Sequence, residues 1–80
     1  MTDAELTRLI VDELRKVAPE RDPAALQSHQ PIRDALEIDS FDFLTVLIGL
    51  SRITGIEVPE ADYGKLATFD GMVRYFRARV

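Results

Sequence analysis

The chain has 80 residues, no cysteine and no tryptophan, and its ten Lys and Arg against fourteen Asp and Glu give a net charge of −4. A chain of this length forms one domain that buries about 60–65% of its unfolded surface, so a large enzyme pocket is not expected. The lack of cysteine excludes disulfides, thiolate zinc sites and cysteine nucleophiles, and suits a reducing cytoplasm. The negative charge, without a basic stripe, argues against nucleic-acid binding.

No charged-then-apolar signal segment opens the chain. The most apolar run, residues 43–50, is interrupted by Thr45 and Gly49 and is far shorter than the roughly 18 residues that a membrane span needs. We therefore expect a cytoplasmic protein without a membrane span.

A capping box, Thr2-Asp3-Ala4-Glu5, predicts the start of a first helix that ends by Ala18-Pro19. Its predicted core face holds Leu6, Leu9, Ile10, Leu14 and Val17, and its solvent face holds Arg8, Asp12, Glu13, Arg15 and Lys16. Residues 18–38 show no sustained period and contain three prolines, which predicts a long ordered connection. We expect it to be held by Leu26, Ile32, Leu36 and Ile38.

A second helix is predicted from a cap at Asp39 to about Thr54, where Gly55 offers a left-handed stop. On a helical wheel the predicted core residues are Phe43, Val46, Leu47, Leu50 and Ile53, opposite an arc of Asp42, Thr45, Gly49 and Arg52. Phe41 and Ile48 also lie on that outer arc, so both are expected to be exposed.

A short turn of helix is predicted over residues 60–63, ending before Gly64, and a last helix is predicted to begin at a Thr68 cap. Its predicted core side holds Phe69, Met72, Val73, Phe76 and Val80, while Tyr63 and Tyr75 are expected to pack their rings with exposed hydroxyls. The predicted fold is therefore all-α: a three-helix bundle plus one short helix, with a long loop between the first and second helices. Residues 1–80 form a single domain, expected to be a monomer.

Ser40 is the most informative position for function. It follows the acidic cap Asp39 at the start of a helix, beside the outward-facing Phe41. A serine at such a position is usually only a capping residue, but here Asp39 can cap. A phosphate ester on Ser40 would lie at the positive end of the helix dipole, which favours anions by roughly 0.3–1 kcal/mol when exposed. The position therefore suits a modified serine.

The pattern Ile32-x-x-x-Leu36-x-x-Asp39-Ser40-Phe41-Asp42, followed by an apolar helix, Gly55-Ile56-Glu57-Val58-Pro59 and a helix headed by Thr68, resembles the acyl carrier protein family over nearly the whole chain. The resemblance implies a protein without catalysis of its own. A phosphopantetheinyl transferase would attach 4′-phosphopantetheine from coenzyme A to Ser40, assisted by Asp39 through metal or hydrogen-bond contacts. The thiol of this arm would hold acyl groups as thioesters, which fits a chain without cysteine.

The sequence departs from the family pattern at several positions. Glu37 stands where the family usually has glycine, which predicts a different backbone at the entry to the second helix, and Phe41 replaces a leucine or methionine. Fatty-acid-type members carry several acidic residues along this helix, where this chain has Thr45, Ser51 and Arg52. The partner-binding residues are therefore predicted to be the Phe41/Ile48 patch with Thr45 and an acidic rim of Asp42, Glu57, Glu60 and Asp62. The partners would be the transferase, acyl-loading enzymes and synthases.

The negative charge is concentrated around Ser40, because residues 34–62 carry seven acidic residues against one basic, a net −6. The sequence does not decide whether the arm carries acyl groups of fatty-acid, specialised lipid or polyketide synthesis. An aminoacyl or peptidyl carrier is the alternative. An unmodified carrier-like interaction module is a further alternative, and the lack of long flanking linkers favours a free-standing protein. A serine hydrolase built from Ser40, His29 and Asp39 is disfavoured, because no Gly-x-Ser-x-Gly elbow surrounds the serine. No catalytic or metal-binding residue is predicted.

Overall fold

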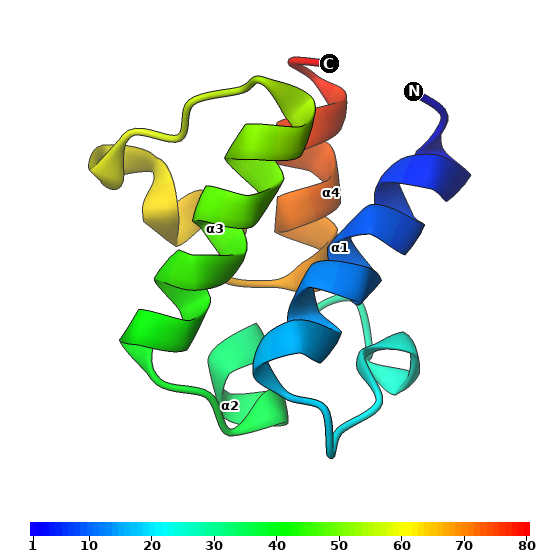
Figure 1. Cartoon of the computed structure of the whole chain (residues 1–80), viewed down its shortest axis with the longest axis vertical. Coiled ribbons are helices and arrows are strands. Elements are labelled where there is room, and N and C mark those ends of the chain that lie inside the picture. Colours follow the sequence, from blue (N-terminus) through cyan, green and yellow to red (C-terminus); the bar gives the residue numbers. More distant parts are fainter.

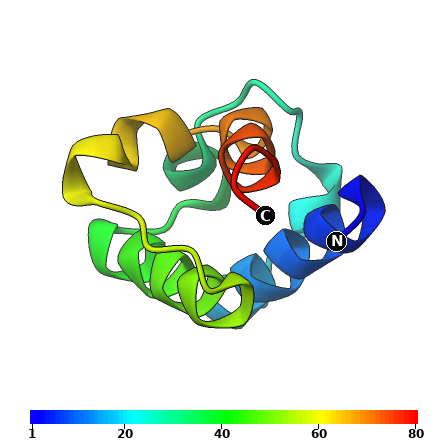
Figure 2. The same cartoon turned by 90° about the horizontal axis from the view of Figure 1, so that it is seen from above.

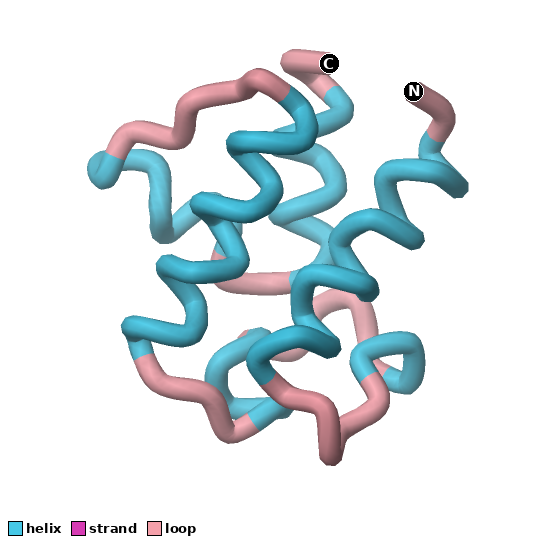
Figure 3. The backbone as a smooth tube through the Cα atoms, viewed as in Figure 1, coloured by secondary structure: helices cyan, strands magenta, loops and turns pink.

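Three helices carry the fold: α1 (Asp3–Val17), α3 (Ser40–Thr54) and α4 (Phe69–Arg77). The computed structural model describes all residues, 1–80, and its regular structure is entirely helical (Figures 1 and 3). A short helix α2 (Ile32–Leu36) and two 3₁₀ helices, η1 (Pro23–Ala25) and η2 (Glu60–Leu66), complete it. α1 packs against α3 and α4, η2 packs against α4, and both termini lie at the same end of the bundle (Figure 1). The predicted all-α class is confirmed.

The helix starts follow the capping residues that the sequence offers. Thr2 Oγ1 accepts from Glu5 N at 3.1 Å and Glu5 Oε1 accepts from Thr2 N at 3.2 Å, which confirms the capping box. Thr68 Oγ1 accepts from Gly71 N at 3.0 Å at the start of α4. Gly55, with φ of 75°, ends α3 in the left-handed conformation, as predicted.

The core lies where the three long helices meet, and the predicted apolar faces supply most of it. Its fully buried members include Ile10 and Leu14 of α1, Val46 and Leu50 of α3, and Met72 and Phe76 of α4.

The predicted connection over residues 18–38 contains more structure than its sequence indicates, namely η1 and α2. Ile32, Leu36 and Ile38 are buried and Leu26 is half-buried, so all four predicted anchors are confirmed. Backbone bonds also tie the connection to the start of α4: Ile32 N donates to Ala67 O and Asp70 N donates to Ser28 O, each at 2.9 Å.

Two predicted core positions are wrong. Ile53 is 51% exposed, because it lies at the edge of the predicted core arc of α3. Ile56 and Val58, which follow the turn at Gly55, pack against the core instead. Val80 is 53% exposed because α4 ends at Arg77.

One predicted solvent-facing position, Glu13, is also wrong. Glu13 is buried in the interface between α1 and α3, where its carboxylate approaches Gly49 so closely that a β-carbon there would collide with it. The missing side chain at Gly49 makes room for the carboxylate, which also pairs with Lys16 Nζ at 2.6 Å.

The predicted turn over residues 60–63 extends further, because η2 runs through Gly64 to the fully buried Leu66. Gly64 lacks a positive φ and so does not act as a stop. Figure 2 shows η2 beside the start of α4 and across from α3.

Candidate functional site

The candidate site is the amino end of α3, where Asp39 and Ser40 have separate roles. Asp39 is the N-cap: its Oδ1 accepts from Asp42 N at 2.8 Å and its carbonyl accepts from Phe43 N at 3.0 Å. Ser40 is the first helical residue; it is exposed, and its hydroxyl takes no part in the side-chain hydrogen bonds at this helix start. The amides of the first helical turn have no partner within a helix. Because Asp39 already pairs with the N–H groups of Asp42 and Phe43, Ser40 is a free hydroxyl beside the unpaired N–H groups of Ser40 and Phe41.

Glu37 fixes how the chain enters this helix start. It has φ of 54° and ψ of 45°, a left-handed conformation that ends α2, and Ile38 N donates back to Arg33 O at 3.0 Å. Its carboxylate pairs with Arg21. The left-handed region is the one that glycine occupies at least cost, so glutamate adopts the tight turn here at the expense of strain.

A cleft of about 700 Å³ opens beside Ser40. Its lining comes from three helices: Ser40, Phe41 and Leu44 of α3, Arg33 and Asp34 of α2, and Glu60, Tyr63 and Gly64 of η2. A second cleft of about 480 Å³ shares Leu44 and Tyr63 with the first and continues along α3 to Gly55. The two clefts thus follow α3 from Ser40 to Gly55; residues of η2 line the first cleft, and residues 55–58 with Tyr63 line the second.

Sequence analysis missed several residues of these clefts. The sequence predicts no site role for Arg33, Asp34, Leu44 or Tyr63, because it predicts neither α2 nor the full length of η2 that faces α3. Leu44 and Tyr63 are half-buried, and only the placement of η2 against α4 makes them neighbours in both clefts.

The apolar patch on the outer side of α3 is confirmed as exposed. Phe41 is 79% and Ile48 48% exposed. Thr45 lies between them and is exposed, but its hydroxyl already donates to Phe41 O at 2.9 Å.

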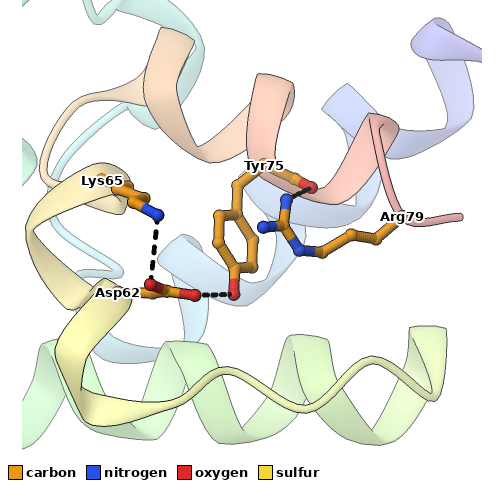
Figure 4. A network of polar contacts seen from close by, with 4 residues as sticks. All are labelled: Asp62, Lys65, Tyr75 and Arg79. Atoms are coloured by element: carbon orange, nitrogen blue, oxygen red, sulfur yellow. Dashed lines mark hydrogen bonds and ion pairs between the residues drawn. The ribbon is translucent and has the colours of Figure 1, made fainter.

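The residues of the predicted acidic rim differ in their surroundings. Glu57 and Glu60 are exposed and line the clefts, and Asp42 is half-buried at the helix start. Asp62, by contrast, accepts from the Tyr75 hydroxyl at 2.7 Å and from Lys65 Nζ at 3.2 Å (Figure 4). Its carboxylate is therefore held by internal partners.

The Asp62 contact also corrects the prediction for Tyr75, whose ring is buried and whose hydroxyl is bonded rather than exposed. The hydrogen bond from Tyr75 and then the contact with Lys65 lower the pKa of Asp62. The same hydrogen bond, followed by burial, raises the pKa of Tyr75. Arg79 stacks on the Tyr75 ring at 3.6 Å and donates to its carbonyl, which completes a clasp between η2 and α4 (Figure 4).

His29 does not line the cleft beside Ser40. It is an exposed residue of the connection before α2.

No group of three or more His, Cys, Asp and Glu side chains is arranged to hold a metal ion. None of the helices is both long enough and apolar enough to cross a membrane.

No protein-family model matches the chain, and no curated protein is significantly similar to it in sequence.

Proposed function

We propose that this chain is a carrier protein whose Ser40 receives 4′-phosphopantetheine from coenzyme A and whose arm then holds acyl groups as thioesters. The observation that carries the proposal is the division of roles at α3, where Asp39 caps the helix and leaves the Ser40 hydroxyl exposed. A serine needed only for helix stability would itself supply the capping oxygen.

The attachment reaction suits this geometry. Ser40 Oγ would form a bond to the phosphorus that bears pantetheine, the bond from that phosphorus to the bridging oxygen would break, and 3′,5′-ADP would leave. The hydroxyl proton would pass to a base on the transferase. The product is a phosphodiester anion beside the free amides of α3, where the helix dipole favours negative charge. The arm would supply the thiol that this chain lacks.

The surface around Ser40 supports binding to partner enzymes. Phe41 and Ile48 expose apolar area beside a helix start that also carries Asp42. Exposed aromatic and apolar side chains next to charged groups are typical of interfaces with defined orientation. Cargo from fatty-acid, specialised lipid or polyketide synthesis fits this proposal, with an aminoacyl or peptidyl carrier as its alternative.

The first test is the mass of the protein after incubation with coenzyme A and a broad-specificity phosphopantetheinyl transferase. The proposal predicts a gain of one phosphopantetheine group. Ser40→Ala should abolish the gain, whereas Ser28→Ala, at an exposed serine of the loop before α2, should leave it unchanged. No gain with several transferases would instead favour an unmodified interaction module.

A second test concerns the partner surface. The double variant Asp42→Lys/Ile48→Ala should weaken transferase binding, measured as a rise in the KM for the carrier. Ile53→Ala is the matched control, since Ile53 is equally exposed on α3 but was not predicted to bind partners. Equal KM values for the double variant and the parent would refute the proposed surface.

A further inference from the structure

Arg33 is the one cationic side chain that lines the cleft beside Ser40. It takes part in none of the ion pairs of the structure, whereas other arginines are paired, such as Arg21 with Glu37, Arg74 with Asp70 and Arg77 with Asp3. An exposed arginine with free donors that lines a cleft is able to bind an anion with several hydrogen bonds.

The backbone of Arg33 is firmly placed although its guanidinium group is free. The preceding Ile32 is fully buried and donates to Ala67 O at 2.9 Å, and Leu36 is buried one turn later. The carbonyl of Arg33 accepts from Ile38 N in the turn that leads to Ser40. Arg33 and Ser40 are thus held at fixed positions on the same cleft by α2, the turn and α3.

Apart from Arg33, the charged side chains of the cleft and of the start of α3 are all acidic, and those at the helix start are Asp39 and Asp42. Asp34 and Glu60 also line the cleft, and both are exposed and carry negative charge. A phosphate group on Ser40 would be repelled by these carboxylates, but would be attracted by Arg33 and by the free amides of the first turn. Arg33 is therefore the one side chain of the cleft whose charge can offset these carboxylates around a phosphate on Ser40.

We infer that Arg33 binds the phosphodiester of the arm on Ser40 and so directs the arm into the cleft between α3 and η2, past Tyr63. This inference rests on the proposed function. It assigns to Arg33 a positioning role: the arm is held in the cleft until a partner enzyme withdraws it, rather than extending freely into solvent.

The test compares nitrogen-15 NMR spectra of the unmodified and the phosphopantetheinylated chain. The Nε–H resonance of Arg33 should shift on modification and its exchange with water should slow, because a charge-assisted hydrogen bond forms. The Nε–H of Arg8, an exposed arginine of α1 that takes part in no ion pair and lines neither cleft, should not change. In the modified chain, Arg33→Ala should shift the phosphorus-31 resonance of the arm, and Arg33→Lys should shift it less.

The outcomes separate this inference from the proposed function. A confirmed mass gain with an unchanged Arg33 resonance, or a phosphorus-31 resonance insensitive to Arg33→Ala, would overturn the role of Arg33 and leave the carrier function standing. Absence of any mass gain would overturn both.

Discussion

Gly49 and Glu13 provide a sharp test of how α1 and α3 pack. Replacing Gly49 by alanine places a methyl group in collision with Glu13 Oε1 and at 3.1 Å from Glu13 Cδ. Glu13 is only 6% exposed, so its carboxylate can move only by disturbing the interface between α1 and α3. The variant therefore introduces a steric conflict at a site that the sequence placed in solvent.

The magnitude follows from two opposing effects. Alanine in place of glycine within a helix is favourable by about 0.5–1 kcal/mol. Overpacking a tight interface costs about 1–3 kcal/mol. We therefore expect Gly49→Ala to lower the free energy of unfolding by up to about 2.5 kcal/mol, which is the overpacking cost less the gain in helix propensity. In a Glu13→Ala background the conflict is absent, and the same substitution should raise stability by about 0.5–1 kcal/mol.

The assay is urea unfolding at neutral pH, followed by far-ultraviolet circular dichroism, for the four chains of this cycle. Glu13→Gln provides a further background: the amide fills the same volume without charge, so Gly49→Ala should stay unfavourable there. The reasoning would be refuted if Gly49→Ala changed the free energy of unfolding by the same amount in the parent chain and in the Glu13→Ala background.

Three further predictions concern the turn, the α4 start and the clasp. Glu37→Gly should be more stable than Glu37→Ala by about 0.5–1 kcal/mol, since both lose the ion pair but only glycine relieves the left-handed strain; equal urea midpoints would contradict this. Gly71→Ala, whose methyl would collide with the Lys65 carbonyl, should cost about 1–3 kcal/mol, whereas Gly64→Ala meets nothing within 4 Å and should change stability little; similar thermal midpoints would count against the packing described. Because its contacts lower the pKa of Asp62, that carboxylate stabilises the fold above its unfolded pKa of about 4, and this stabilisation is lost as the pH falls through the lower folded pKa. Tyr75→Phe should therefore unfold at a lower urea concentration than the parent at pH 7, and the difference in urea midpoint should be smaller at acid pH. A difference in urea midpoint that does not change with pH would contradict a stabilising role of the Asp62 carboxylate.

The long helices could be predicted because each carries its own signals. The Thr2 box, the Asp39 cap, the Gly55 stop and the Thr68 cap all lie where the structure places helix ends. These signals act within a few residues along the chain, so they do not depend on tertiary contacts.

The short elements could not be predicted for a physical reason. α2 has five residues, too few to show a helical period, and its N-cap, Pro31, makes no side-chain cap bond. It ends at a left-handed glutamate instead of glycine, so the usual stop signal is missing. Its position depends on the bonds from the segment of Ser28 and Ile32 to the start of α4, which join residues far apart in sequence.

The candidate site was predictable only in part. Ser40, Asp39 and the exposed Phe41 and Ile48 follow from the helix start and the wheel, and the structure places them as expected. The cleft beside them depends on how η2 packs against α4, which no local pattern indicates.

The most direct test of the carrier proposal is the position of the modified residue. After treatment with coenzyme A and a transferase, trypsin should release residues 34–52 as one peptide, which contains Ser40, Thr45 and Ser51. Fragmentation of that peptide in a mass spectrometer should place one phosphopantetheine group on Ser40. An unmodified peptide, or a group carried by Thr45 or Ser51, would contradict the proposal.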